Sequence, residues 1–186
     1  MKKIIALVLL CLLIPLLVYS ATIPSKRVLV VYYSRTGHNQ LVAEALANKF
    51  NADLERLIDR KKRTGLFAFF IAGKDANTKQ IGNIEPLKLN PKDYDTILIG
   101  GPAWNGHITP AVRAFLVRND LSGKKIGLFG SCHFIGVEDA LKEAAGLIYG
   151  AGNKKFPTLA LKEEELKQET LTKKIDAFYS AMQYSE

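Results

Sequence analysis

The chain has 186 residues, which is enough for one domain with a buried core and short for two. Apolar residues make up 48% of it, a proportion that favours a globular fold over disorder. The formal net charge is +8. Such a charge suits an anionic membrane surface, an acidic partner or a simply solvated lysine-rich surface. Because no stripe of interleaved basic and aromatic residues is present, we expect no nucleic-acid partner.

The N-terminal segment differs from the rest of the chain. Lys2 and Lys3 precede an unbroken apolar run over residues 4–18, and small residues follow at Ser20 and Ala21. This order is typical of a secretory signal peptide. We therefore expect residues 1–20 to be a signal peptide or an uncleaved N-terminal membrane anchor, with residues 21–26 as a short linker.

An anchor would need more apolar length than a signal peptide. Continuing the run to Ile23 gives about the length that a bilayer requires, so residues 4–23 are the expected region of membrane association. The two lysines favour a cytoplasmic N-terminus. The domain is therefore expected to be extracytoplasmic, either secreted or held at the membrane.

Short apolar runs alternate with helical patterns from residue 27 to the end, which predicts an α/β domain with a parallel sheet covered on both faces. The order along the chain is strand, helix, repeated five times. We expect strands at 27–33, 52–58, 94–100, 125–131 and 155–161, and helices at about 38–50, 63–79, 110–118, 137–149 and from 162 to the end. One doubly wound domain over residues 27–186 accounts for this pattern.

Two helices carry specific packing expectations. The first should bury Leu41, Val42, Ala45, Leu46 and Phe50, which recur at helical spacing. The second contains the apolar stretch 66–71, whose aromatic rings could touch a membrane but are expected to pack in the core.

Ligands of such sheets bind beyond the carboxyl ends of the strands, where the strand order reverses. The loop after the first strand is Ser34-Arg35-Thr36-Gly37-His38-Asn39. Hydroxyls, a glycine and the N–H groups of a helix N-terminus form an anion site. Since both the Walker pattern and G-x-G-x-x-G are absent, the pattern favours a single terminal phosphate over a nucleoside triphosphate or a dinucleotide. A plain helix cap is the alternative.

The loop after the third strand contains the only tryptophan, Trp104, within Gly100–His107. An aromatic side chain at that place can stack on a planar ring or fold back into the core. The preceding Gly-Gly-Pro turn leaves the backbone approachable, so its N–H and C=O groups could read the edge of a heterocycle.

The loop after the fourth strand, residues 130–136, combines small, polar and aromatic residues. Cys132 and His133 suggest a nucleophile and base, but adjacent side chains on an extended chain point apart, so we expect no catalytic side chain. The three histidines lack ligand spacing, and we expect no metal site. Cys11 and Cys132 are the only cysteines, and their positions argue against a disulfide.

Together the three loops resemble the flavodoxins and flavodoxin-like FMN-binding proteins. The family's first loop, roughly [ST]-x-T-G-x-T, is matched by residues 34–39, with Asn39 in place of the last hydroxyl residue. The second match runs from Tyr94-Asp95 through 99–104 and on to 109–116. The resemblance implies a three-layer, five-stranded parallel sheet with strand order 2-1-3-4-5, preceded here by the hydrophobic segment.

The resemblance also implies FMN as cofactor and assigns residues to it. The phosphate would be bound by the first loop, the ring would lie between the second and third loops, and a backbone carbonyl near Gly106 could accept a hydrogen bond from the reduced flavin. The expected cofactor-binding residues are Ser34, Arg35, Thr36, Gly37, His38, Asn39, Pro102, Ala103, Trp104, Asn105, Gly106, Ser131 and Cys132.

Three functions stay open at this point. The first is an electron-transfer flavoprotein, exported or membrane-tethered, whose redox partner is a protein or a quinone. The second is an FMN-dependent oxidoreductase of the quinone-reductase or protoporphyrinogen-oxidase type, and the third is a binding module without flavin. Flavodoxins that serve soluble partners are typically acidic, so the basic balance of this chain favours a membrane-side or differently charged partner.

Overall fold

The computed structural model describes residues 27–61, 68–148 and 155–185. The expected signal peptide or anchor, residues 1–20, and the linker 21–26 lie outside the described residues. Within the described ranges, no helix combines the length and apolar character needed to cross a membrane.

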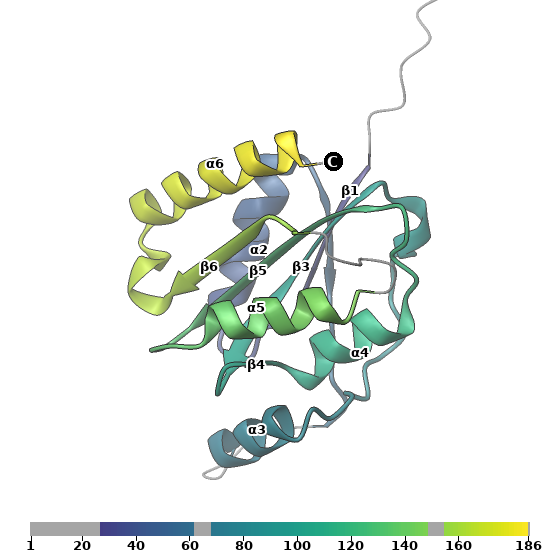
Figure 1. Ribbon diagram of the computed structural model, residues 1–186, viewed down its shortest axis with the longest axis vertical. Helices are drawn as coiled ribbons and strands as arrows, with labels where there is room; N and C mark the ends of the chain where they lie inside the picture. Colours follow the sequence, from purple (N-terminus) through teal and green to yellow (C-terminus); the bar gives the residue numbers. More distant parts are fainter. Residues whose placement is uncertain (1–26, 62–67, 149–154, 186) are drawn as a thin grey trace, which may run out of the picture.

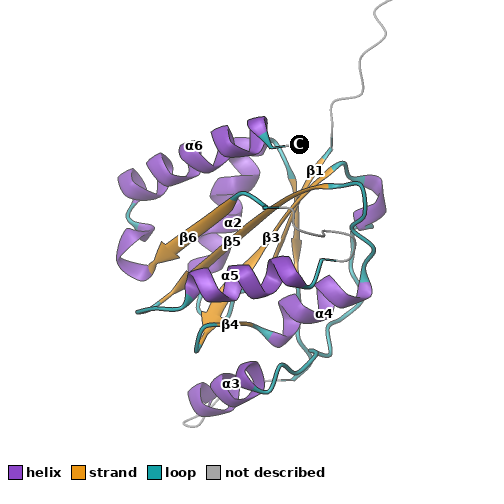
Figure 2. Cartoon of the chain, in the orientation of Figure 1, coloured by secondary structure: helices purple, strands orange, loops and turns teal. Residues whose placement is uncertain are grey.

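A parallel sheet forms the centre of the domain, and its strand order confirms the expected arrangement (Figures 1 and 2). The order is β2-β1-β3-β5-β6, which is 2-1-3-4-5 when only the parallel strands are counted. The strands are β1 (Val28–Tyr32), β2 (Asp53–Arg56), β3 (Thr96–Trp104), β5 (Lys125–Cys132) and β6 (Thr158–Lys162). The short β4 (His107–Ile108) pairs antiparallel with the end of β3.

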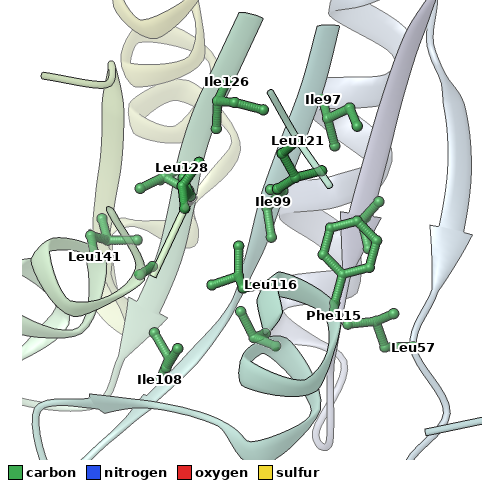
Figure 3. Close-up of a cluster of buried hydrophobic side chains, with 14 of the residues drawn as sticks. Leu57, Ile97, Ile99, Ile108, Phe115, Leu116, Leu121, Ile126, Leu128 and Leu141 are labelled. Carbon is green, nitrogen blue, oxygen red and sulfur yellow. The ribbon is translucent and has the colours of Figure 1, made fainter. Parts of the chain in front are cut away.

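Helices cover both faces of the sheet, and the central strands are therefore buried on both sides. Helices α2 (His38–Phe50) and α6 (Gln168–Tyr184) pack on one face, against Val30 and Leu98 among others. Helices α4 (Pro110–Arg118) and α5 (Val137–Gly146) pack on the other, where Phe115 of α4 belongs to the same buried cluster as Ile97 and Ile99 of β3 (Figure 3). Helix α3 (Ala68–Asn77) lies apart, beyond the carboxyl ends of the strands (Figure 1).

Several helix expectations need correction. Leu41 is 47% exposed, and the buried face of α2 is instead formed by Asn39, Val42, Ala43 and Leu46. Leu41 precedes Val42 by one residue, which on a helix turns it about 100° away from that face. A helix does form in the 63–79 region, but Phe70 is 71% exposed, so its expected place in the core is wrong.

The C-terminal elements begin later than the pattern predicts. Strand β6 starts at Thr158 rather than 155, and α6 starts at Gln168 rather than near 162. A 3-10 helix over Glu163–Leu166 fills the interval. It is capped by Glu165, whose carboxylate accepts from the N–H of Lys162 at 2.8 Å. This local cap favours a separate short turn over a continuous helix.

The sequence predicted a loop over Gly100–His107, and this prediction is wrong. The segment forms the end of β3 and a tight hairpin into β4. Asn105 and Gly106 have φ of 52° and 77°, the left-handed conformations that a two-residue type I′ turn requires. The Asn-Gly dipeptide is the signal for this hairpin. As a result Trp104 stands on a strand and is held by strand pairing with His107.

Candidate ligand-binding site

The candidate site lies at the carboxyl ends of β1, β3 and β5, around the point where the strand order reverses between β1 and β3. Three segments meet there: residues 34–39 after β1, the hairpin 103–108, and residues 132–136 after β5. Each is described in turn.

The first segment is arranged for binding an anion with its backbone. Ser34 is buried, and its hydroxyl accepts from the N–H of Gly37 at 3.1 Å, which folds the loop into a tight turn. Gly37 precedes α2 with φ of 99°, and no described heavy atom lies within 4 Å of the place a Cβ would take. The first-turn N–H groups of α2 have no intrahelical acceptors. Such a turn at a helix N-terminus offers backbone donors and a favourable dipole to an anion.

Asn39 connects this segment to the third one. Its side chain is 2% exposed, and its amide nitrogen donates to the hydroxyl of Ser131 at 2.8 Å. The amide oxygen has no hydrogen-bond partner among the described residues. Asn39 and Ser131 were both expected at the cofactor, and the structure brings them together beneath the site.

A half-buried carboxylate supports the hairpin. Glu143 of α5 accepts from the N–H of Ile108 at 3.1 Å and from the guanidinium of Arg113 at 2.7 Å. Burial opposes the ionisation of Glu143, but these hydrogen bonds and the charge of Arg113 together hold the pKa of the carboxyl below its ordinary value. Arg113 is itself buried, and the ion pair of Arg113 and Glu143 connects α4, α5 and the hairpin.

The third segment approaches the hairpin very closely. A Cβ on Gly136 would come within 2.7 Å of the Cα of Gly106, so the two backbones touch where only glycine fits. Cys132 ends β5 and is buried, and desolvation raises the pKa of its thiol. A raised pKa disfavours the thiolate, which is the nucleophilic form of a cysteine.

A cluster of two histidines and one carboxylate joins the rim. Glu163 follows β6, and its two carboxylate oxygens contact the Nε2 of His38, at 3.1 Å, and the Nδ1 of His133. His38 was expected at the phosphate through its place in the loop; its side chain points to Glu163. The hydrogen bond from His133, followed by the charges of both imidazoles, lowers the pKa of Glu163.

The three segments and α3 enclose a cleft of about 490 Å³, a volume within the range of small-molecule sites. Its wall contains six of the thirteen expected residues: Arg35, Ala103, Trp104, Asn105, Gly106 and Cys132. Pro102 does not line this cleft; it lines a separate void of about 10 Å³ between β3, α4 and α5. Ala103 lines both the cleft and this void.

The phosphate-loop residues Ser34, Thr36, Gly37, His38 and Asn39 also lie outside the cleft wall, as does Ser131. Arg35 links their loop to the cleft. Seven lining residues were not predicted: Ala72, Gly73, His133, Phe134, Ile135, Gly136 and Asp139. Residues 133–136 directly follow a predicted strand, and this position at a strand end could have indicated that they line the site. Ala72 and Gly73 carried none, because only the tertiary structure brings α3 here.

Within the part of the chain that the structure describes, no group of three or more His, Cys, Asp or Glu side chains could hold a metal ion. The ring of Trp104 packs edge to face with the ring of Tyr33, with centroids 5.9 Å apart and an interplanar angle of 83°. The cleft combines small and apolar residues with the polar side chains of Arg35, Asn105, His133 and Asp139.

Comparisons with known proteins give matches in structure and none in sequence. No protein-family model matches the chain, and a search of curated proteins finds no match. A flavoprotein of Lactobacillus acidophilus NCFM, solved in complex with FMN, is 18% identical with a TM-score of 0.61, over 77% of this chain and 98% of that one.

Two proteins of Bacteroides with provisional assignments as flavoproteins are also similar. That of Bacteroides eggerthii DSM 20697 is 20% identical with a TM-score of 0.67, over 87% of this chain and 100% of that one. That of Bacteroides uniformis ATCC 8492 is 21% identical with a TM-score of 0.64, over 81% and 98%. The chain has the flavodoxin-like fold.

Proposed function

We propose that this chain is an FMN-binding electron-transfer flavoprotein, exported or held at the membrane through residues 4–23. One observation carries the proposal: an apolar cleft that includes Trp104 adjoins a phosphate-type turn at the N-terminus of α2. The FMN complex of the similar L. acidophilus flavoprotein supports it.

The residues present fit the two ends of FMN. The turn at 34–37 and the first turn of α2 supply N–H donors to a phosphate, and Arg35 adds a positive charge between the turn and the cleft. The planar ring would lie between Trp104 and the segment that contains Cys132. Apolar walls with a few polar groups suit a large, flat heterocycle.

FMN, when bound, supplies the redox chemistry. The chain's own residues bind it, orient it and exclude water. Trp104 is fixed by the edge-to-face contact with Tyr33 and by the pairing of β3 with β4. The Asn105–Gly106 turn presents its backbone to the cleft, and it is held in place by Glu143 behind Ile108. Neither Cys132 nor His133 is needed as acid, base or nucleophile.

Titration of the purified full chain with FMN tests the proposal, with flavin fluorescence and the visible spectrum as readouts. Thr36→Glu places a carboxylate at the phosphate turn, and Trp104→Ala removes the ring wall. Each should weaken FMN binding at least tenfold, or about 1.4 kcal/mol. Thr172→Glu and Tyr184→Ala, on exposed positions of α6, are the matched controls and should leave FMN affinity unchanged.

Two results would refute the proposal: a protein that stays colourless after FMN is added, or FMN binding that survives both site variants unaltered. The first would support the alternative of a flavin-free binding module. The second would place the flavin somewhere other than this cleft.

A second candidate, an FMN-dependent oxidoreductase acting on a small acceptor such as a quinone, is favoured by the position of α3. Ala72 and Gly73 of α3 line the cleft, and a Cβ on Gly73 would lie 2.8 Å from the amide nitrogen of Asn105. This wall leaves a sheltered space beside the ring site. Steady turnover of a quinone with NAD(P)H, without a partner protein, would favour the enzyme over the carrier.

A further inference from the structure

The two ends of the sheet have different surfaces, and the chain enters at the end opposite the cleft. Because the sheet is parallel, the first described residue, Arg27, stands at the amino end of β1 (Figure 1). The cleft lies beyond the carboxyl ends of β1, β3 and β5. Strand β3 has 9 residues, so the two ends are about 30 Å apart.

The amino end carries a lysine-lined hollow next to the chain entry. Lys124, Lys125 and Lys155 line a hollow of about 350 Å³, and no acidic side chain of the described residues lines it. Lys125 is the first residue of β5, Lys124 directly precedes it, and Lys155 lies shortly before β6. The hollow is joined to the entry point by Asp95, which accepts from the N–H of Arg27 through its side chain and from the N–H of Lys125 through its carbonyl, at 3.1 and 2.9 Å.

Nearby carboxylates are largely occupied by other groups. Asp53 forms a salt bridge with Arg27 at 3.3 Å. Asp120 accepts from the N–H of Ser122 and lies within the field of Lys92 and Lys124. Of the three lysines that line the hollow, Lys155 is exposed, and Lys124 and Lys125 are half-buried.

The cleft end carries charges of both signs. Arg35 lines the cleft, and the exposed residues Arg60 and Lys61 follow β2. Acidic residues gather there, at Glu138 and Asp139 in the first turn of α5 and at 163–165 after β6. Lys61 is paired with Asp75 at 2.7 Å. The rim also exposes large apolar side chains, since Phe134 and Ile135 are 73% and 84% exposed. This end is apolar with mixed charge, which suits a protein surface better than anionic headgroups.

We propose that the lysine-lined amino end rests on the anionic surface of the bilayer that holds the N-terminal segment, so that the cleft opens into the aqueous phase. This inference rests on the membrane tether of the proposed function and deepens it. From Ile23, where the expected span ends, to Arg27 the chain can reach at most about 14 Å. That is less than the length of the sheet, so a tethered domain cannot invert to press its cleft end onto the same bilayer.

The orientation defines the class of electron partner. A quinone dissolved in the bilayer could not reach the cleft of a domain held in this way. The exposed rim of Phe134 and Ile135 would instead meet a water-borne partner protein with an apolar patch. Each lysine near an anionic surface contributes electrostatic attraction that weakens as salt is added.

The single tryptophan offers a direct test, because Trp104 lines the cleft. The full chain, without flavin, is reconstituted in vesicles of phosphatidylcholine with 30% phosphatidylglycerol (roughly the anionic content used to mimic a charged leaflet). Brominated lipids should leave Trp104 emission unquenched, whereas aqueous acrylamide should quench it. Quenching by brominated lipid would overturn the proposal and place the apolar rim on the bilayer instead.

Amine labelling with a water-soluble reagent, read by mass spectrometry, tests the other end. Lys125 and Lys155 should label several-fold more slowly on the mixed vesicles than on pure phosphatidylcholine. Lys142 and Lys173, exposed on α5 and α6, are the internal controls and should label equally on both. Equal labelling of all four, or a mature chain whose intact mass lacks residues 1–20, would overturn the proposal. Neither experiment depends on flavin binding. A result that overturns the proposed orientation is therefore distinct from a failure of the chain to bind FMN.

Discussion

Replacing Glu143 by alanine tests the ion pair that it forms with Arg113. The change removes three hydrogen-bond interactions of the carboxylate: Arg113 at 2.7 Å, the N–H of Ile108 at 3.1 Å and His107 at 3.3 Å. It also leaves the guanidinium of Arg113, whose side chain is 5% exposed, without its counter-charge. Stranding a buried charge typically costs about 3–5 kcal/mol, so Glu143→Ala should destabilise the protein by about that amount.

Comparison with a second variant separates charge from shape. Glu143→Gln keeps the size and one acceptor but removes the charge, and it should cost about 1–3 kcal/mol. The free energy of unfolding is measured in urea by far-ultraviolet circular dichroism, with Glu164→Ala, an exposed position, as the control. If Glu143→Ala costs less than about 1 kcal/mol, Arg113 is solvated in the native protein and the reasoning from burial is wrong.

The same pair has a defined pH dependence. The pKa of Glu143 in the folded protein lies below its ordinary value of 4.5, so the folded state binds the proton less readily than the unfolded state. Its contribution to stability is therefore fully present above pH 4.5 and is lost as the pH falls toward the folded pKa. The stability difference between the unaltered protein and Glu143→Gln should shrink over that acid range; a difference that stays constant there would contradict the assignment.

Three further changes probe the contacts between the site segments. Ser131→Ala removes the hydroxyl that accepts from the buried amide of Asn39 and should cost about 1–3 kcal/mol in urea unfolding. Gly100→Ala would place a Cβ 2.3 Å from a carbonyl oxygen of β5, so we expect a chain that fails to fold, seen as loss of soluble protein. Gly136→Ala forces a side chain to φ of 94° and to 2.7 Å from Gly106. It should lower the melting temperature and separate the cleft walls, detected as a shift in Trp104 emission; an unchanged temperature and spectrum would contradict the close approach.

The central layers of this fold were predictable because their signals are local. Strands buried on both faces read as continuous apolar runs, and Pro110 after Thr109 marks the start of α4 in sequence as in structure. The strand order followed from the family resemblance rather than from the pattern. The error at Leu41 arose because periodicity defines the width of an apolar stripe better than its centre.

The hairpin at Asn105–Gly106 was missed although its signal was present. The Gly-Gly-Pro and Trp residues before it suggested a ligand loop, and that interpretation hid the type I′ turn. The exposed Phe70 was missed for a different reason. Its apolar run predicts burial, but whether a helix packs on the sheet or stands beyond its end depends on the tertiary structure, which periodicity does not encode.

Asn39 shows where sequence reasoning about the site reached its limit. The amide at the sixth position of the loop stands where the family pattern has a hydroxyl residue, and Asn39 was expected to bind the cofactor. The structure shows a different use, since the side chain donates to Ser131, which is 92 positions away in sequence. A buried amide that joins two loops fixes their spacing, and with it the distance between the phosphate turn and the ring cleft. The departure from the family pattern therefore bears on the shape of the site as a whole. In the proposed FMN complex, the N–H groups of α2 would supply the phosphate donors that a hydroxyl at position 39 would otherwise add.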